Sequence, residues 1–371
     1  MKISFIGAGN VALGMASFIP EEHSIYFHSS KPEGWSEQLT YIDKVTRDNY
    51  TRKIDTVSSS YELVVTDADF IFITHPAFML ENTIDKMRSF IKKGAKIGVV
   101  PGTGGAEYFI NKIAEKDAIL FGLDRVPCVA RILKYGDSVI ASKKKKTRLA
   151  AIPRKYTDEI ASEVSILLGM DIEPLPNFLT VTFTPSNPIV HTARLFSLLN
   201  ADQQVTKKFE YNIPFYGEWD DLASKMLIGC DNELQKICNV LSNLDMSKVI
   251  PLTDHYEISS IEELTSKIKS IETMSHILSP MLKEENHFII DKSSRYFEED
   301  FPYGLCVLKG FAVVCKIETP YMDKILKWYE KFSGVQYFIN NEFIGRDLKE
   351  TAIPQNYNLD SIEKIEKFYS K

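Results

Sequence analysis

The sequence predicts an α/β fold, in which a doubly wound parallel sheet in the first half of the chain is followed by a mainly α-helical C-terminal domain. Three observations predict it: a strand, turn and helix at the N-terminus (KISFIGAGNVALGM), apolar runs such as DFIFIT at residues 69–74, and helical periodicity from Pro188 onward. Strand–helix alternation is typical of parallel α/β sheets. Because 371 residues exceed one ordinary core, we expect two domains, residues 1–184 and 185–371.

Each expected strand is a short apolar run bounded by turn residues. An unbroken apolar run is typical of a strand that is covered on both faces, and the segments between the runs carry the spacing of amphipathic helices. The expected strands are residues 2–6, 24–27, 69–74, 96–100 and 118–122. In the second half, apolar residues recur at helical spacing in TARLFSLL, DDLASKMLIGCDNELQKICNVLSNL and TPYMDKILKWYEKFSG.

The composition is that of a globular protein and disfavours several classes of function. A net charge of −6 gives no reason to expect nucleic acid or an acidic membrane as a partner. No segment approaches 18 uninterrupted apolar residues, so we expect no membrane span. The five cysteines are scattered without metal-ligand spacing, so we expect no metal site and a reducing, cytoplasmic compartment.

The first turn, GAGNVA at residues 7–12, has the form GxGxxA that is typical of a dinucleotide-binding Rossmann domain. Gly7 permits the tight turn, Gly9 lets the backbone approach a pyrophosphate, and Ala12 allows close contact between helix and sheet. Asn10 and Val11 complete the turn as candidate cofactor-binding residues. The alternative is an ordinary glycine-rich turn, which the strand before the motif and the helix after it disfavour.

The end of the second expected strand, FHSSKPEGW, carries no acidic residue where recognition of the ribose 2′-hydroxyl of NAD would need one. His28, Ser29, Ser30 and Lys31 offer hydrogen-bond donors and a positive charge instead, which suit a 2′-phosphate. We therefore expect NADP(H) to be favoured over NAD(H) as the cofactor. A polar loop that makes no contact with a cofactor is the alternative.

Two further loops follow apolar runs that we expect to be parallel strands. Ligands of open α/β sheets collect at the carboxyl ends of the strands. Thr74, His75 and Pro76 in one loop, and Pro101 and Gly102 in the other, are therefore candidate cofactor-binding residues. For His75, a polar loop position without a catalytic part is the preferred interpretation.

His191 lies between a turn-like cluster, PSNP at residues 185–188, and an apolar helical run. Periodicity alone favours a packed, structural histidine. The segment SSRYFEEDFPYGL, residues 293–305, offers partners, because it holds an arginine and three carboxylates in what we expect to be a loop entering a helix. One of these acids, turned inward, would orient the imidazole. The alternative for the acidic cluster is a solvated loop.

With these motifs in order, the chain as a whole resembles the opine dehydrogenases, the octopine/nopaline dehydrogenase group. The resemblance covers nearly the whole chain and is carried by GAGN, PGTGGAEYF, VPCVAR, SNPIVH, FYGEW, RYFEEDFPYGL and ETPYMDKIL. Its most specific parts are the NPxxH pattern and the segment RYFEEDFPYGL. It implies condensation of an amino acid with an α-keto acid, often pyruvate, to an imine that NAD(P)H reduces.

The resemblance also implies that His191 and Asp300 form a catalytic pair and that Arg295 binds substrate. The chemistry agrees, because expulsion of water during imine formation needs an acid–base group that works near neutral pH, as histidine does. A carboxylate on the other ring nitrogen fixes the tautomer, and substrate carboxylates suit arginine. Arg131, in VPCVAR, is a second candidate for this task. Tyr216 either lines the amino-acid pocket or serves as hydrophobic packing.

Three functions stay open at this point. An opine-type dehydrogenase is favoured over a reductase of a free keto or hydroxy acid, and over a dinucleotide-sensing protein without turnover. Thr192, Ala193 and Arg194 follow the histidine where the resemblance leads us to expect a second proline, so the amino acid and the keto acid are undecided. The sequence likewise does not decide between a monomer and a homodimer.

Overall fold

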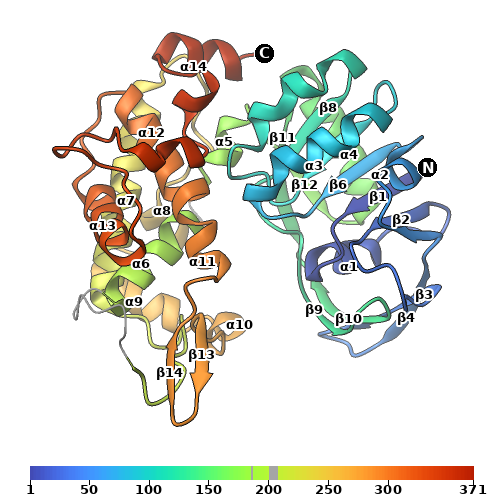
Figure 1. The fold of residues 1–371 in the computed structure, drawn as a ribbon, viewed down its shortest axis with the longest axis horizontal. Helices are drawn as coiled ribbons and strands as arrows, with labels where there is room; N and C mark the ends of the chain where they lie inside the picture. The colour runs from blue at the N-terminus through green and yellow to red at the C-terminus, as the bar shows by residue number, and fades with distance from the viewer. Residues whose placement is uncertain (185–186, 200–207) are drawn as a thin grey trace. The chain divides into compact units, whose positions relative to one another are not determined.

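The computed structural model describes residues 1–184, 187–199 and 208–371. Pro185 and Ser186, which the sequence assigns to a turn, lie outside the described residues. The chain forms two compact units (Figure 1), of which the first holds Met1–Thr182 and Lys367–Lys371 and the second holds Phe183–Glu366. The chain first passes from one unit to the other between Thr182 and Phe183, two residues before the boundary predicted between residues 184 and 185.

The return of the last five residues to the first unit corrects the prediction of one continuous domain over residues 185–371. A contact between two side chains that are far apart in the sequence explains this return. The Tyr369 side chain is buried, and its hydroxyl donates a hydrogen bond of 2.7 Å to Oε1 of Glu107. A hydrophobic pattern read along the sequence does not reveal such a distant polar partner.

The first unit is built on an eight-stranded sheet with the strand order β12-β11-β8-β7-β6-β1-β2-β5. All neighbours from β8 to β5 are parallel, whereas β11 runs antiparallel to β8. The predicted doubly wound parallel sheet is therefore confirmed, with one antiparallel step that the apolar patterns did not reveal. The strands are β1 Lys2–Ile6, β2 Ser24–His28, β5 Thr56–Ser58, β6 Phe70–Ile73, β7 Lys96–Val99, β8 Ile119–Leu123, β11 Lys146–Ile152 and β12 Asp171–Pro174.

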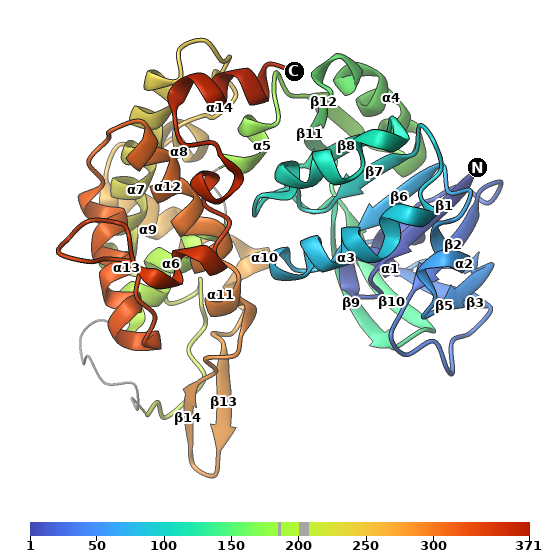
Figure 2. The ribbon, with the colours of Figure 1, turned by 45° about the horizontal axis from the view of Figure 1, so that its top comes forward.

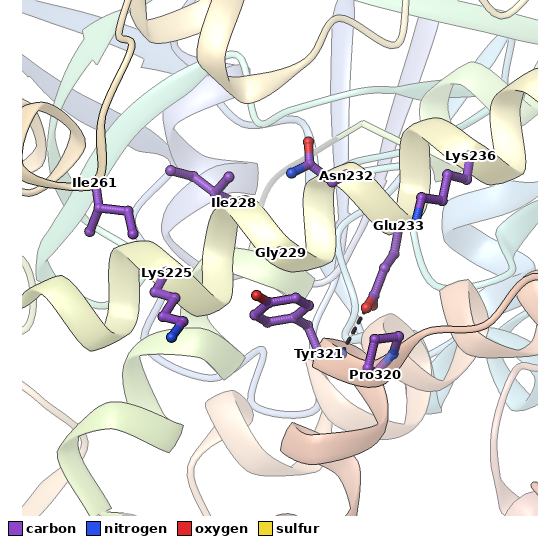
Figure 3. A pocket seen from close by; sticks show the side chains of 9 residues that line it. All are labelled: Lys225, Ile228, Gly229, Asn232, Glu233, Lys236, Ile261, Pro320 and Tyr321. Carbon is purple, nitrogen blue, oxygen red and sulfur yellow. Dashed lines mark hydrogen bonds between the residues drawn. The ribbon is translucent and has the colours of Figure 1, made fainter.

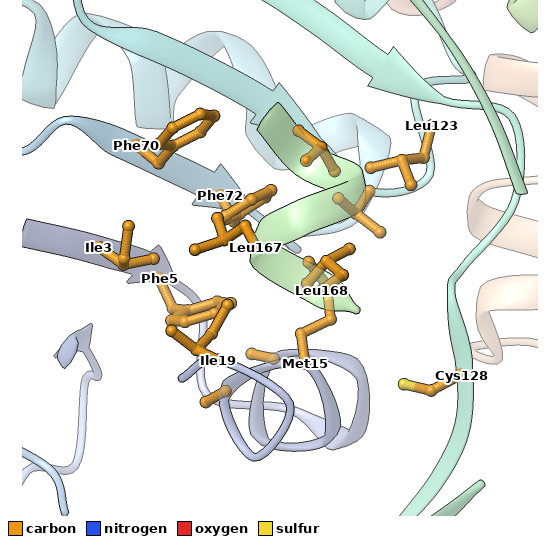
Figure 4. Packing of buried hydrophobic residues seen from close by; sticks show 14 of the residues in the cluster. Ile3, Phe5, Met15, Ile19, Phe70, Phe72, Leu123, Cys128, Leu167 and Leu168 are labelled. Carbon is orange, nitrogen blue, oxygen red and sulfur yellow. The ribbon is translucent and has the colours of Figure 1, made fainter. Parts of the chain in front are cut away.

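Helices cover this sheet, and apolar side chains close the space between them. Every residue of β6 is buried, as expected for a strand inside a doubly covered sheet. Figure 4 shows Phe5 and Phe72 side by side with Met15, Leu167 and Leu168 of the covering helices. Full burial of each such side chain contributes roughly 1.5–3 kcal/mol. The helices are α1 Asn10–Ala16, α2 Tyr61–Val65, α3 Leu80–Met87, α4 Thr157–Leu168 and α5 Leu179–Thr182, with short 3-10 turns at Ala77–Met79, Arg88–Phe90, Ala106–Lys112, Ala114–Lys116 and Arg154–Tyr156.

A second, four-stranded sheet with the order β4-β3-β10-β9 was not predicted. It lies against α1, where a Cβ on Gly14 would come within 2.8 Å of both Cys128 and Ala130. The sequence did not predict these strands, because one face of the four-stranded sheet is open to solvent and their apolar runs are short. The strands are β3 Gln38–Asp43, β4 Asn49–Lys53, β9 Cys128–Lys134 and β10 Ser138–Lys143.

The second unit is mainly helical, as predicted. Asp220 and Ser260 begin α7 and α9 by accepting hydrogen bonds from backbone N–H groups of the first turn. A hairpin, β13 Met281–Glu284 and β14 His287–Ile290, extends from the helices and was not predicted (Figure 2). The helices are α6 Asn187–Leu199, α7 Asp221–Val240, α8 Leu252–Tyr256, α9 Ile261–Lys269, α10 Glu272–Ser275, α11 Arg295–Glu298, α12 Cys306–Val314, α13 Pro320–Ser333 and α14 Ile362–Tyr369, with a π-helix at Phe301–Leu305 and 3-10 turns at Arg346–Glu350 and Pro354–Tyr357. The last residues of α14, from Lys367, belong to the first unit. None of the helices within the described ranges has the length and apolar character that a bilayer crossing requires.

Candidate active site

His191 is held by hydrogen bonds at both ring nitrogens inside the second unit. The residue lies in α6 and is 7% exposed. Its Nδ1 lies 2.7 Å from Oδ2 of Asp300, and its Nε2 lies 2.8 Å from the hydroxyl of Tyr216. A carboxylate only accepts hydrogen bonds, so Nδ1 carries the proton and Nε2 of the neutral ring accepts from the Tyr216 hydroxyl. Aspartate, imidazole and phenol therefore form one chain of hydrogen bonds.

The close approach of two helical segments brings His191 and Asp300 together. The π-helix Phe301–Leu305 directly follows Asp300 and packs against α6. A Cβ on Gly304 would lie 2.7 Å from Cβ of Pro188, so glycine is needed where the two segments meet. Pro188 precedes His191 by about one helical turn, and Gly304 follows Asp300 by about the same interval. Pro188 of the NPxxH pattern and Gly304 of the PYGL pattern therefore serve the close packing of these two segments.

Aromatic rings enclose the imidazole. The ring of Tyr296 lies over it with centroids 4.2 Å apart, and Phe215 meets it edge-on at 5.5 Å. Tyr216 is stacked in parallel on Trp219, with centroids 6.1 Å apart. Tyr216 thus belongs to the packed core of the unit and also makes a polar contact with His191. Burial raises the pKa of the Tyr216 phenol above its usual value of 10, so the group is uncharged at neutral pH.

Arg194 supports this arrangement and was not predicted to do so. Its buried guanidinium donates to the backbone oxygens of Phe215 at 2.9 Å and Glu218 at 2.7 Å, and it pairs with the carboxylate of Asp220. These bonds fasten the segment that carries Tyr216 to α6, one turn beyond His191. The sequence showed Arg194 only as a departure from the expected proline. A charged residue inside an apolar helical run was the available signal, because such residues are rarely buried without partners.

Arg295, the predicted substrate-binding arginine, begins α11, so the segment expected to be a loop is in part helical. The correction has a simple cause, since Ser294 caps this single turn by accepting from the backbone N–H of Tyr296. The Arg295 side chain is 58% exposed, and its guanidinium pairs with Glu299, with Nε 2.7 Å from Oε2. Of the three acids in this segment, Asp300 is the one that meets the imidazole.

In the first unit, the turns after β1, β2, β6 and β7 lie at the carboxyl ends of adjacent parallel strands, where ligands of such sheets bind. Gly7 has φ +106°, and a Cβ there would lie 2.7 Å from Oγ1 of Thr74. Gly9 is exposed, and apart from its two chain neighbours no atom of the described residues lies within 4 Å of the place where its Cβ would be. Its backbone is therefore open to a pyrophosphate, as the GxGxxA motif requires.

The neighbouring residues of this turn serve the fold. The side chain of Asn10 accepts a hydrogen bond of 2.8 Å from the backbone N–H of Ile132 in β9. Val11 packs against the core, and Ala12 is fully buried. The turn thus fits a dinucleotide chiefly through the backbone around Gly9, while the side chains of Asn10, Val11 and Ala12 hold sheet, helix and β9 together.

The loops after β6 and β7 contain both polar and packing residues. Nδ1 of His75 lies 2.8 Å from Oγ1 of Thr83, and burial lowers the pKa of His75 to about 4, so this ring is neutral at pH 7. Pro76 follows it half-buried. Gly102 packs against the backbone of β8, because a Cβ there would lie 2.5 Å from Cα of Gly122. Gly102 therefore faces another strand, and Pro101 before it is half-buried.

The four residues expected to meet a 2′-phosphate differ in their accessibility. His28 is stacked on Tyr61 with centroids 3.8 Å apart, and burial lowers its pKa, so it brings no charge at neutral pH. Ser29 is buried and accepts a hydrogen bond of 3.0 Å from the backbone N–H of Lys31. Ser30 and Lys31 are exposed. Of the four, these two side chains are therefore the most accessible to a ligand. Arg131 is also exposed and lies on β9 of the first unit.

A cavity of about 270 Å³ lies elsewhere in the second unit (Figure 3). Glu233 at its wall accepts hydrogen bonds from the backbone N–H groups of Tyr321 and Met322, at 2.7 and 3.0 Å, so it caps the start of α13. Burial raises the pKa of Glu233 to about 7. No predicted site residue lines this cavity. It is lined by Lys225, Ile228, Gly229, Asn232, Glu233, Lys236, Ile261, Pro320 and Tyr321.

Comparisons with known proteins give the fold and the site a context. Residues 174–333 match the family described as NAD/NADP octopine/nopaline dehydrogenase, alpha-helical domain, and residues 2–104 match that described as NADP oxidoreductase coenzyme F420-dependent. The chain is 25% identical to the tauropine dehydrogenase of Arabella iricolor, over 98% of this chain and 99% of that one.

Solved structures have the same fold. A structure of octopine dehydrogenase with NADH and L-arginine superposes with a TM-score of 0.85 at 22% identity, over 98% of this chain and 97% of the other. Yersinopine dehydrogenase with NADP⁺ bound gives a TM-score of 0.63 at 14% identity, over 100% and 98% of the two chains. Two family matches, a relative that is aligned over almost its whole length and the common fold agree with one another, and together they support the opine dehydrogenase family of NAD(P)-dependent oxidoreductases as the family that this chain resembles.

Proposed function

We propose that the chain is an opine-type dehydrogenase, which joins an amino acid to an α-keto acid such as pyruvate through an imine and reduces the imine with NAD(P)H. The observation that carries the proposal is the buried His191 between Asp300 and Tyr216. The family resemblance supports it, and octopine dehydrogenase has been solved with NADH and L-arginine and with NADH and pyruvate.

The residues of the second unit supply the acid–base chemistry. When the amine has added to the keto carbon, the hydroxyl group of the adduct must be protonated to leave as water, and His191 is the proton source. Asp300 stabilises the imidazolium form that precedes this transfer and fixes the ring orientation. Arg295 binds a substrate carboxylate, and Arg131 is a second candidate for that task. NAD(P)H supplies the hydride that reduces the imine.

The first unit holds the cofactor, with the backbone around Gly9 open to the pyrophosphate and Gly7 forming the tight turn before it. NADP(H) is favoured over NAD(H), because the end of β2 carries no acid and presents Ser30 and Lys31 to solvent. A lysine at this position attracts the 2′-phosphate of NADP(H) and does not hinder the binding of NAD(H). We therefore expect Lys31 to increase the affinity for NADP(H) and to leave the affinity for NAD(H) unchanged.

A cofactor-oxidation assay tests the function. The enzyme is incubated with NADPH and pyruvate, with and without each member of a panel of amino acids, and the secondary amine product is identified by mass spectrometry. We expect cofactor oxidation that depends on the amine. Oxidation at the same rate without any amine would instead identify a keto-acid reductase, and tight cofactor binding without turnover on any pair would identify a dinucleotide-sensing protein.

The substitution Lys31→Ala tests the cofactor preference. A charge-assisted hydrogen bond contributes roughly 1.5–3 kcal/mol, so kcat/KM for NADPH should fall about tenfold or more. The value for NADH should stay within twofold of that of the wild type. Lys53→Ala, at another exposed lysine of the first unit, is the control. Equal losses with both cofactors would show that Lys31 does not meet the 2′-phosphate.

A further inference from the structure

The nitrogen through which His191 would act on a substrate is covered. Asp300 occupies Nδ1 and the Tyr216 hydroxyl occupies Nε2, at 2.7 and 2.8 Å. Tyr216 itself is 5% exposed. A substrate atom that bonds directly to Nε2 would have to take the place of a buried phenol.

Several contacts oppose displacement of that phenol. The ring is stacked on Trp219, whose indole N–H donates a hydrogen bond of 2.9 Å to Ser224. The backbone on both sides of Tyr216 is fastened by Arg194, through the carbonyl oxygens of Phe215 and Glu218. Moving the hydroxyl away from Nε2 would break this packing and leave buried polar groups without partners, which costs about 1–3 kcal/mol for each group.

We propose that the Tyr216 hydroxyl is a catalytic relay, which carries the proton from Nε2 of His191 to the oxygen that leaves the substrate. This inference rests on the function proposed above and assigns Tyr216 a role beyond lining a pocket. The substrate oxygen then contacts the phenol oxygen of Tyr216. The imidazole of His191 contacts the phenol and does not touch the substrate.

The atoms balance in a single concerted step. The Nε2–H bond of the imidazolium breaks, and its proton goes to the phenol oxygen. The O–H bond of the phenol breaks at the same time, and its proton goes to the hydroxyl of the amine adduct. The C–O bond of the adduct breaks and water leaves, while the nitrogen lone pair forms the C=N bond. Tyr216 ends as a neutral phenol and His191 as a neutral imidazole.

Electrostatics support a relay over an independent base. Burial raises the pKa of Tyr216, and the nearby Tyr296 and Asp300 raise it further, so a free phenolate is disfavoured. The phenol therefore accepts one proton as it donates another, and it stays uncharged. Because Asp300 favours the imidazolium on the other side of the ring, the hydrogen-bond chain has a defined direction.

The substitution Tyr216→Phe tests the relay, because it removes the hydroxyl and keeps the ring that stacks on Trp219. We expect the single-turnover rate with keto acid, amine and NADPH to fall roughly 10²-fold, with the KM for keto acid changed less than threefold. The melting temperature should fall by only a few degrees, because Nε2 of His191 loses one hydrogen-bond partner. Tyr211→Phe is the matched control, since it removes an exposed hydroxyl that donates to Glu218 at 3.0 Å in the same segment. A Tyr216→Phe enzyme with an unchanged or higher rate would overturn the proposal, because the hydroxyl would then only shield Nε2.

A solvent isotope experiment separates a relay from a structural role. In mixtures of H₂O and D₂O, the single-turnover rate of the wild type should curve below a straight line as the deuterium fraction rises, because two protons move together. The curve should become straight in Tyr216→Phe. A straight line for the wild type means that one proton moves, and the relay is wrong.

Failure of the relay is distinguishable from failure of the proposed function. If the wild type reduces a keto acid without an amine, condensation is wrong, yet the carbonyl oxygen still needs a proton and the same two experiments apply. If the wild type turns over with neither substrate set, both proposals fail.

Discussion

His191 owes its proposed reactivity to its neighbours, because its ring is buried, paired with a carboxylate and enclosed by aromatic residues. Replacing it by alanine removes the proton source and should lower kcat roughly 10²–10⁴-fold. The proposed cofactor site lies in the first unit, so the dissociation constant of NADPH should change less than twofold. Stopped-flow turnover and a fluorescence titration measure the two quantities. A His191→Ala enzyme with full activity would exclude the residue from the mechanism.

Arg295 is paired with Glu299 at an exposed position, and such a pair contributes about 0–1 kcal/mol. A substrate carboxylate that binds Arg295 must compete with Glu299. Glu299→Gln should therefore lower the KM for that substrate, by up to about fivefold. The exposed neighbour Glu298, changed to glutamine, is the matched control and should leave KM unchanged. A raised KM in Glu299→Gln would mean that the acid orients the arginine.

At the scale of elements, the close approach of the π-helix to α6 sets the distance between Asp300 and His191. Gly304→Ala would place a methyl group 2.7 Å from the rigid ring of Pro188, so the two segments must separate. We expect the free energy of unfolding to fall by about 1–3 kcal/mol and kcat to fall roughly 10²-fold, because a displacement of about 1 Å disturbs the acid–base geometry.

Gly310→Ala is the control for this prediction. It lies in α12, and its added methyl group would meet Pro354 at the same distance of 2.7 Å. Gly310 is far along the helix from Asp300, so this variant should lose similar stability and keep its kcat. Thermal unfolding and steady-state rates for both variants provide the comparison. Equal losses of kcat would show that general destabilisation, and not the position of Asp300, accounts for the effect.

Much of the element order was predictable, because buried parallel strands such as FIFI in β6 have an unmistakable pattern. The four-stranded sheet and the hairpin β13–β14 were not, because their strands are half-exposed and lack that pattern. For the site, the sequence and its family resemblance named His191, Asp300 and Tyr216, and the structure has them hydrogen bonded, while their roles stay predictions. The contact between Arg194 and the segment of Tyr216 depends on how a loop folds back, which periodicity does not encode.

At the scale of the whole molecule, a buried carboxyl group links stability to pH. Glu107 is fully buried and accepts hydrogen bonds from the hydroxyls of Thr182 and Tyr369, at 2.5 and 2.7 Å. Burial raises its pKa from an ordinary value of 4.5 to about 7. Between these values the folded state holds a proton that the unfolded state releases. Stability from this group is therefore fully present below about pH 4.5 and is lost as the pH rises through about 7.

The variant Glu107→Gln keeps the shape of the group and removes its titration. The difference in unfolding free energy between wild type and variant should change by on the order of 3 kcal/mol between pH 4.5 and pH 8, in favour of the variant at the higher pH. Urea unfolding at a series of pH values measures it. Taking the difference between the two proteins cancels the titration of Glu233 and Asp231, whose pKa values are also raised. Parallel curves across the whole range would contradict the prediction.

The return of Lys367–Lys371 to the first unit has a consequence for biosynthesis. When residues 1–182 have left the ribosome, the buried carboxyl of Glu107 still lacks the phenol that will cover it, because Tyr369 is translated only after the whole of the second unit up to Glu366. The nascent first unit is thus incomplete until Tyr369 has been translated. A fragment cut after residue 182 would keep that gap, and a peptide corresponding to the C-terminal segment, added in trans, is the piece that would fill it.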